Sequence, residues 1–278
     1  MLSEVGECPL SRHFSVFPLL QVADFFYKEQ LMSSSPSSSK KSACCCWPLL
    51  SSSIGRKWIV AITGIVLVLF VIGHLLGNLS IFLGPDAINA YALFLQSLGE
   101  ILWLIRIVLL ACVVLHIWFT IALWRENRAA RPQKYAVKND LQTTVYARLM
   151  RLSGLTVLAF ILFHLAEFTW QAFTPEYRNW VDAQGRHDVY RMVIAGFSNP
   201  FVTGFYMIAI GLLAMHLSHG IASLFQTLGI TTAKMRPLFE RAGRIVAWVI
   251  FVGYVSIPLA VFFGILSYPH VARCSLCH

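Results

Sequence analysis

Charged residues are scarce in this chain: they make up 13% of its 278 residues, whereas soluble domains carry about 25%. Acidic residues are the rarer sign, with 13 Asp and Glu against 22 Lys and Arg. The sequence also lacks the segments of about ten alternating apolar and polar residues that build transmembrane β-barrels. A soluble domain and a barrel are thereby excluded. The composition, 57% hydrophobic, predicts an integral membrane protein made of helices.

Five apolar segments are each long enough for the roughly 20 residues that a helix needs to cross the hydrocarbon core of a bilayer. We expect them at 58–83, 101–124, 152–173, 201–228 and 245–267. The predicted fold is therefore all-α, a bundle of five transmembrane helices within a domain spanning residues 51–268. Residues 1–50 include a Ser/Pro/Lys tract and are expected to be a disordered extension or a misassigned start, with Met32 as the alternative start. An amphipathic segment on the membrane surface is the other alternative.

The positions of the basic residues predict how the bundle is oriented. Lys and Arg gather in the loops after the second and fourth spans and just before the first span. Of the other two loops, one carries Asp86 and Glu100, and the other has acidic and basic residues in balance. Because loops rich in Lys and Arg stay in the cytoplasm, we expect a cytoplasmic N-terminus and a C-terminus outside. This pattern explains the net charge of +9 without a nucleic-acid partner.

The first four spans contain one histidine each at membrane depth, and these are His74, His116, His164 and His216. An ionisable side chain inside a membrane is costly without a partner, so each is a candidate functional residue. At 1.5 Å per residue, His74 and His164 lie about 24 and 18 Å from the inner surface, in the outer half of the bilayer. The other two lie about 22 Å from the outer surface, in the inner half. Depth therefore predicts an outer pair, His74 with His164, and an inner pair, His116 with His216.

Two imidazoles that face each other across a helix bundle are what a six-coordinate haem iron requires as axial ligands. The four histidines therefore predict two stacked bis-histidine haem sites. For any one histidine, the alternative is a hydrogen bond that bridges two helices. His219 lies three residues after His216 and on nearly the same helix face, so it is an alternative ligand or a residue that packs around the inner haem.

Four local motifs accompany these histidines. In chain order they are Ser-Ser-Ile-Gly-Arg-Lys (52–57), Gly-His-Leu-Leu-Gly-Asn-Leu (73–79), Phe-His-Leu (163–165) and His-Leu-Ser-His-Gly-Ile-Ala-Ser-Leu-Phe-Gln-Thr-Leu-Gly (216–229). With the span count and the orientation, they make residues 51–267 resemble the five-helix, dihaem cytochrome b membrane anchor of succinate dehydrogenase/fumarate reductase. In that family the ligand on the fourth span stands four residues before a glycine, which favours His216 over His219.

The resemblance implies an electron-transfer role in the respiratory chain and the tricarboxylic acid cycle. Such a subunit lies in the inner membrane of a prokaryote and anchors a flavoprotein and an iron–sulfur protein on its cytoplasmic face. Two haems b carry electrons between the iron–sulfur chain and a membrane quinone, commonly menaquinone. Dicarboxylate chemistry belongs to the flavoprotein, so the resemblance implies no catalytic residue in this chain.

Three acidic or basic residues near the outer haem are further candidates. Glu100 and Arg106, at the outer end of the second span, could exchange protons with the quinone or pair with a haem propionate; anchoring at the membrane interface is the alternative. Glu167, three residues after His164, is either a buried proton-transfer carboxylate or a residue that reaches the outer headgroups.

The chain ends in a motif that departs from the family pattern. Cys274, Cys277 and His278 form Cys-x-x-Cys-His, the attachment pattern of a c-type haem, within the short outer tail 269–278. A third, covalent haem is one prediction for this tail. A disordered tail, a metal site and a disulfide are the alternatives.

Two other functions use membrane histidines. The cytochrome b subunit of a membrane hydrogenase or formate dehydrogenase also binds haem through them, although the motifs around His74 and His216 argue against it. A transporter could use histidines as proton relays, but this class tends to have broken helices or internal repeats. Bound haem separates the transporter from the electron-transfer proteins.

Overall fold

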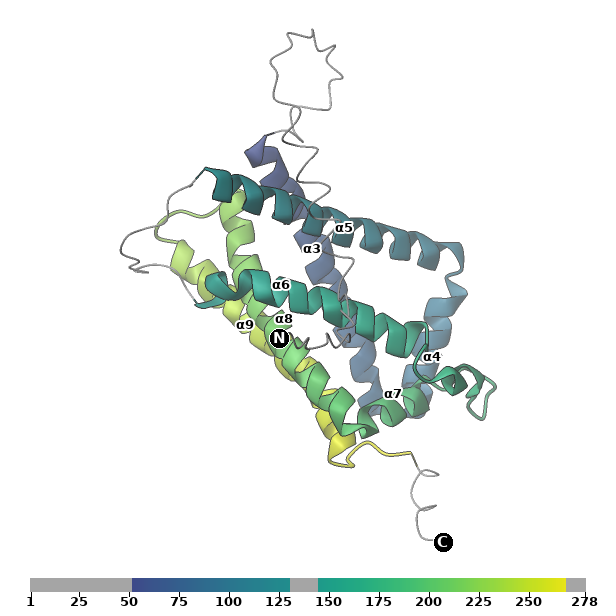
Figure 1. Ribbon diagram of the computed structural model, residues 1–278. Helices are drawn as coiled ribbons and strands as arrows, with labels where there is room; N and C mark the ends of the chain where they lie inside the picture. Colours follow the sequence, from purple (N-terminus) through teal and green to yellow (C-terminus); the bar gives the residue numbers. More distant parts are fainter. Residues whose placement is uncertain (1–51, 131–144, 269–278) are drawn as a thin grey trace, which may run out of the picture. The chain divides into compact units, whose positions relative to one another are not determined.

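The computed structural model describes residues 52–130 and 145–268, and these residues are arranged almost entirely in helices. Within them the β pairing is limited to an isolated bridge between Val181 and His187. Residues 1–50, and the tail with Cys274, Cys277 and His278, lie outside the described residues. Five helices are long and apolar enough to cross a membrane, as predicted: α3 (Ser53–Leu79), α5 (Glu100–Ala129), α6 (Val145–His164), α8 (Pro200–Thr227) and α9 (Arg236–Phe262) (Figure 1).

The ends of these helices depart from the apolar segments, and in α3 and α8 a capping side chain marks the first turn. Ser52 begins α3 by accepting a hydrogen bond from the backbone N–H of Gly55 at 3.0 Å. Asn199 caps α8 in the same way, and Pro200 follows at the first helical position. The helix α9 starts at Arg236, nearer the N-terminus than the predicted span. Its first turns carry charged side chains, so an apolar segment could not include them. Pro258 lies inside α9 but does not end it.

Two of the long helices end in tighter or wider turns. α3 continues into the 3₁₀ turn η1 (Ser80–Leu83), and α6 continues into η2 (Leu165–Thr169), a π-helical turn. Single π-helical turns are rare and are frequently found at functional sites. The third predicted span therefore ends at η2, four residues before its predicted limit at Phe173.

Three short helices were not predicted from the sequence: α4 (Pro85–Ser97), the 3₁₀ helix η3 (Pro175–Asn179) and α7 (Val189–Ser198). α4 packs against α7, and the two lie together at one end of the bundle (Figure 1). A Cβ atom on Gly77 would lie 2.4 Å from the Tyr91 ring, so glycine is needed for α4 to approach α3 this closely. We call α4, η3, α7 and the loop residues 180–188 the polar cap.

Buried hydrogen bonds hold the polar cap together around Asp188, which is 1% exposed. One carboxylate oxygen of Asp188 accepts hydrogen bonds from Asn89 at 3.2 Å and from the backbone N–H of Arg191 at 3.0 Å. The other accepts from the hydroxyl of Tyr268 at 3.0 Å. Asp188 therefore joins α4, the start of α7 and the segment that follows α9.

Asp182 forms a second, more exposed centre of the polar cap. It accepts hydrogen bonds from the backbone N–H of Arg186 at 2.9 Å and from its guanidinium at 2.7 Å, and a further one from Asn89 at 3.2 Å. Burial alone would raise the pKa of the Asp182 carboxyl, but these hydrogen bonds lower it below its usual value. The loop 180–188 is thus held by a charged carboxylate at neutral pH.

The Asp188→Ala variant should destabilise the polar cap strongly, because it leaves three donors without their acceptor in a buried place. We expect a loss of about 2–4 kcal/mol and a thermal midpoint in detergent lower by about 5–10 °C. Asp86→Ala is the matched control, since Asp86 is 79% exposed in its ion pair with Arg186; such pairs contribute about 0–1 kcal/mol. Equal midpoints for the two variants would contradict this account of the cap.

The five long helices pack as two pairs plus one supporting helix. α5 packs along α3, and α6 packs along α8. α9 packs closely on α8, where a Cβ atom on Gly243 would lie 2.9 Å from the carbonyl oxygen of Ser218. α3 touches both α8 and α9, whereas neither α5 nor α6 has comparably broad contact with the opposite pair in the described part of the chain. The histidines project from these two pairs.

Positive charge is concentrated at the end of the bundle opposite the polar cap, which we call the basic end. The basic residues there are Arg56, Lys57, Arg125, Arg128, Arg148, Arg151, Lys234, Arg236, Arg241 and Arg244. The acidic side chains described at this end are Glu126, which pairs with Arg56 between α5 and α3, and Glu240, which pairs with Arg236 at 3.0 Å. The described part of the basic end thus carries a large excess of positive charge.

Candidate functional site

The histidines at the cap end of the bundle, His74 of α3 and His164 of α6, face each other across the two helix pairs. Their ring centroids are 5.8 Å apart and the rings are nearly perpendicular, at 84°. Because a metal–imidazole bond is about 2 Å long and the nitrogen lies about 1 Å from the ring centre, two imidazoles on one metal have centroids about 6 Å apart. The separation of this pair therefore suits a shared metal.

Aromatic side chains surround the outer pair and fix one of its rings. The hydroxyl of Tyr206, on α8, lies 3.1 Å from Nδ1 of His164. The ring of His74 stacks on Phe70, with centroids 5.4 Å apart. The hydroxyl of Tyr254, on α9, donates to the carbonyl oxygen of Val71 at 2.7 Å and brings its ring to 6.3 Å from His74. Sequence reasoning did not identify either tyrosine, because tyrosines in apolar helices usually belong to the core.

The histidines nearer the basic end are His116 of α5 and His216 of α8, and each is held by hydrogen-bonding groups of a neighbouring helix. Nδ1 of His116 lies 3.1 Å from the carbonyl oxygen of Val60 and 3.2 Å from the hydroxyl of Thr63. Since a carbonyl oxygen can only accept, Nδ1 of His116 bears the proton, and its Nε2 keeps a free lone pair. Nδ1 of His216 lies 3.3 Å from the hydroxyl of Ser153.

A glycine makes room for each ring of the inner pair. A Cβ atom on Gly64 would lie 3.4 Å from Cε1 of His116, and one on Gly154 would lie 3.5 Å from Cε1 of His216. Each ring therefore rests directly on the backbone of the neighbouring helix. In both cases the hydroxyl residue that faces Nδ1, Thr63 or Ser153, immediately precedes the glycine.

The same arrangement therefore occurs twice in the bundle. α3 and α6 each carry a hydroxyl residue and a glycine that support an inner histidine, followed at the same interval by an outer histidine of their own. The interval from Gly64 to His74 equals that from Gly154 to His164 and corresponds to about 15 Å along a helix. In the sequence this repeat is visible only as a Thr-Gly and a Ser-Gly dipeptide, each ten residues before a histidine.

His219 is oriented differently from His216. It interacts electrostatically with Glu240 of α9 as well as with His216, and both histidines are half-buried. No described side chain is recorded in a hydrogen bond with its ring. His216, by contrast, is held by Ser153 and interacts with His116. The geometry therefore distinguishes two histidines that the sequence left as alternatives.

These arrangements fit two bis-histidine haem sites. Ligating histidines usually donate their other ring N–H to an oxygen, which orients the ring, and three of the four candidates have an oxygen within 3.3 Å of Nδ1. Among the described residues no group of three or more His, Cys, Asp and Glu is arranged to hold a metal ion. The closest pair of candidate ligands is His74 with His164, and a haem iron takes two such axial donors.

The three charged residues predicted near the outer pair differ in burial: two are exposed and one is buried. Glu100, in the first turn of α5, and Arg106 are both exposed, and the guanidinium of Arg106 lies 5.0 Å from the centroid of the Trp103 ring. No contact of either residue with the outer pair is recorded. Glu167 is buried in η2, so it does not extend to the surface.

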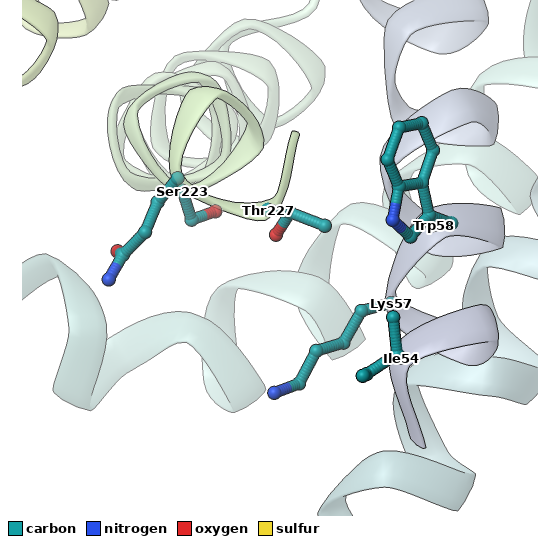
Figure 2. Close-up of a pocket in the computed structure, with 6 residues that line it drawn as sticks. Ile54, Lys57, Trp58, Ser223 and Thr227 are labelled. Carbon is teal, nitrogen blue, oxygen red and sulfur yellow. The ribbon is translucent and has the colours of Figure 1, made fainter. Parts of the chain in front are cut away.

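A pocket of about 470 Å³ lies between α3 and α8 at the basic end. It is lined by Ile54, Lys57 and Trp58 from the first turns of α3, and by Ser223, Gln226 and Thr227 from the last turns of α8 (Figure 2). The Lys57 amine supplies a positive charge, the other polar groups are neutral, and no lining residue is acidic. The pocket therefore suits a negatively charged group.

Comparisons of this chain with protein-family models, with curated proteins and with solved structures give no match.

Proposed function

We propose that this protein is a dihaem cytochrome b that anchors a succinate dehydrogenase/fumarate reductase complex in the membrane. The observation that carries the proposal is the pairing of His74 with His164, whose ring centroids are 5.8 Å apart on helices α3 and α6. His116 and His216, each with an oxygen close to Nδ1, would be the ligands of a second site of the same kind. When bound, each haem would supply a reversible one-electron centre.

In this proposal the chain's own residues hold and insulate the two centres. His74 and His164 are the axial ligands of the outer haem b, and His116 and His216 those of the inner one. In this proposal Nδ1–H of His216 donates to the hydroxyl of Ser153 and Nδ1–H of His164 to that of Tyr206, which would orient both rings and leave Nε2 free to face the iron. With two histidine ligands each, the haems would supply electron-transfer centres with no position left for a substrate.

The Lys57 pocket is the proposed place for a propionate of the inner haem. It lies on α3 and α8, towards the basic end from the inner pair, and it offers an amine, an amide and two hydroxyl groups to an anion. The alternative for the Lys57 charge is orientation of the chain alone. Glu100 and Arg106 remain proposed contacts of the quinone or of an outer propionate.

The partners and the orientation follow from the same proposal. The basic end would face the cytoplasm of a prokaryote and contact the iron–sulfur protein, which in turn carries the flavoprotein. Electrons would pass between that protein and a quinone, menaquinone in the commonest case, through the inner and then the outer haem. The tail with Cys274, Cys277 and His278 would lie outside, where a third, c-type haem could attach.

A pyridine haemochrome spectrum of the purified full chain, with haem counted per polypeptide, tests the proposal. We expect two haems b per chain. An additional haem that resists acid–acetone extraction and has a c-type band would assign Cys274, Cys277 and His278 to a third centre. A preparation from the native membrane that contains no haem would overturn the electron-transfer function and favour a histidine-relay transporter.

A further inference from the structure

The two rings of the outer pair are nearly perpendicular, with an angle of 84° between the planes of His74 and His164. An imidazole bound to a metal can turn about the metal–nitrogen bond, so the groups packed around the ring decide its plane. The angle between the two planes is therefore imposed by this chain's own residues. It requires groups that fix each ring separately.

The ring of His164 is fixed by a hydrogen bond to a side chain that cannot move. Its Nδ1 lies 3.1 Å from the hydroxyl of Tyr206 on α8. Tyr206 is 4% exposed, and its ring packs edge-on against Phe160 and Phe197, with centroids 5.0 and 4.9 Å away. Because a phenol packed on both sides cannot follow a turning imidazole, rotation of the His164 ring would break this hydrogen bond.

The ring of His74 is held by packing, since no hydrogen bond to this ring is found within the described residues. Two aromatic rings lie beside it. Phe70 stacks on it with centroids 5.4 Å apart and 18° between the planes, and Tyr254 lies at 6.3 Å and 37°. Phe70 is 44% exposed and so is free on one side. Tyr254 is therefore the neighbour that can fix the plane of His74.

Tyr254 is itself fixed at its far end. Its hydroxyl donates a hydrogen bond of 2.7 Å to the carbonyl oxygen of Val71, three residues before His74 on α3. The residue before it, Gly253, lets α9 approach α3 closely, since a Cβ atom there would lie 2.9 Å from Cδ2 of Leu75. α9 thus contacts α3 just before and just after His74, and the Tyr254 ring is held in place beside the imidazole.

We propose that Tyr206 and Tyr254 are positioning residues that hold the two axial imidazoles of the outer haem perpendicular and thereby set the electronic state of its iron. The inference rests on the proposed function. Parallel imidazole planes act on the same d orbital of the iron and separate it in energy from its partner, whereas perpendicular planes act on both orbitals alike. Nearly equal orbital energies give a ferric haem a strongly anisotropic electron paramagnetic resonance (EPR) signal, with a larger maximum g value than parallel planes give.

The two tyrosines should differ in their effect on the midpoint potential. A hydrogen bond accepted from Nδ1–H makes an imidazole a more basic ligand, and a more basic ligand stabilises the ferric iron. Loss of the Tyr206 hydroxyl should therefore raise the midpoint potential of the outer haem. Tyr254 forms no hydrogen bond with the His74 ring, so loss of its hydroxyl should change the angle between the planes and leave ligand basicity as it was.

The test is EPR spectroscopy together with a redox titration of the purified full chain. We expect a strongly anisotropic signal from the outer haem of the unaltered protein. In Tyr206→Phe the maximum g value of this signal should fall and its midpoint potential should rise. In Tyr254→Phe the maximum g value should fall while the potential is kept. The inner haem should keep both values in each variant, and variants of His164 and His216 assign the two signals.

Tyr190→Phe is the matched control, because Tyr190 is also buried, at 6% exposed, and its hydroxyl also donates to a backbone carbonyl, that of Ser267, but in the polar cap. This variant should leave both haem signals unchanged. Two haems with an outer signal typical of parallel planes, or an outer signal that neither Tyr206→Phe nor Tyr254→Phe changes, overturn the inference and leave the proposed function standing. A chain without haem overturns both.

Discussion

The His216→Ala variant should bind one haem instead of two, and the lost haem should be the inner one. Removal of the imidazole leaves His116 as the single ligand of a site that needs two axial donors. The outer pair lies about 15 Å away along the bundle and shares no ligand with the inner pair, so its spectrum should persist. Haem counted per chain, together with a redox titration that shows one midpoint potential, measures this result.

His219→Ala is the control for this prediction, since the two histidines lie three residues apart on one helix. His219 interacts with Glu240 and is not held by Ser153, so its removal should leave two haems. The reverse outcome, with haem lost in His219→Ala and kept in His216→Ala, would make His219 the ligand. Loss of both haems in either variant would mean that the two sites depend on each other for folding.

A leucine at Gly154 should displace the inner haem without altering any ligand. The Cβ atom of an added side chain meets Cε1 of His216 at 3.5 Å, which is ordinary contact, but the further carbons of leucine have to enter the space of the ring. Overpacking of this kind costs about 1–3 kcal/mol. If the cost falls on the bound state, it corresponds to roughly a tenfold to hundredfold loss of haem affinity. Competition for haem with an apo-haemoprotein of known affinity gives the value.

The graded variants at this position separate crowding from a general loss of stability. Gly154→Ala should keep the inner haem, because the Cβ atom alone fits. Gly204 on α8 has open space around it, so Gly204→Leu should leave both haems in place. Equal haem loss in Gly154→Ala and Gly154→Leu would show that the glycine serves the helix backbone and not the ring.

The number of long helices and the pairing of histidine depths could be predicted because both depend on one-dimensional properties. An apolar run of sufficient length is visible in the sequence, and depth is proportional to residue number in a helix. The depth argument paired His74 with His164, and the structure brings these two rings within 5.8 Å. The roles of the histidines as haem ligands stay a prediction.

The features that escaped prediction depend on contacts between distant segments. Tyr206 faces His164 from another helix, and Asn89 meets Asp188 from α4, although nothing in the local sequence of either residue indicates its partner. The π-helical turn at Glu167 is a departure from the helix period that a hydropathy profile averages out. The short helices of the polar cap are too short for such a profile to separate from loops.

The repeated glycine support in α3 and α6 makes the site approximately symmetric about an axis along the membrane normal, because alternate spans run in the same direction. Each half, α3–α5 or α6–α8, contributes one histidine to the outer pair and one to the inner pair, so a half alone completes neither. Two copies of a single helical hairpin would complete both. Helix α9, which packs on α8 and α3, lies outside this twofold arrangement.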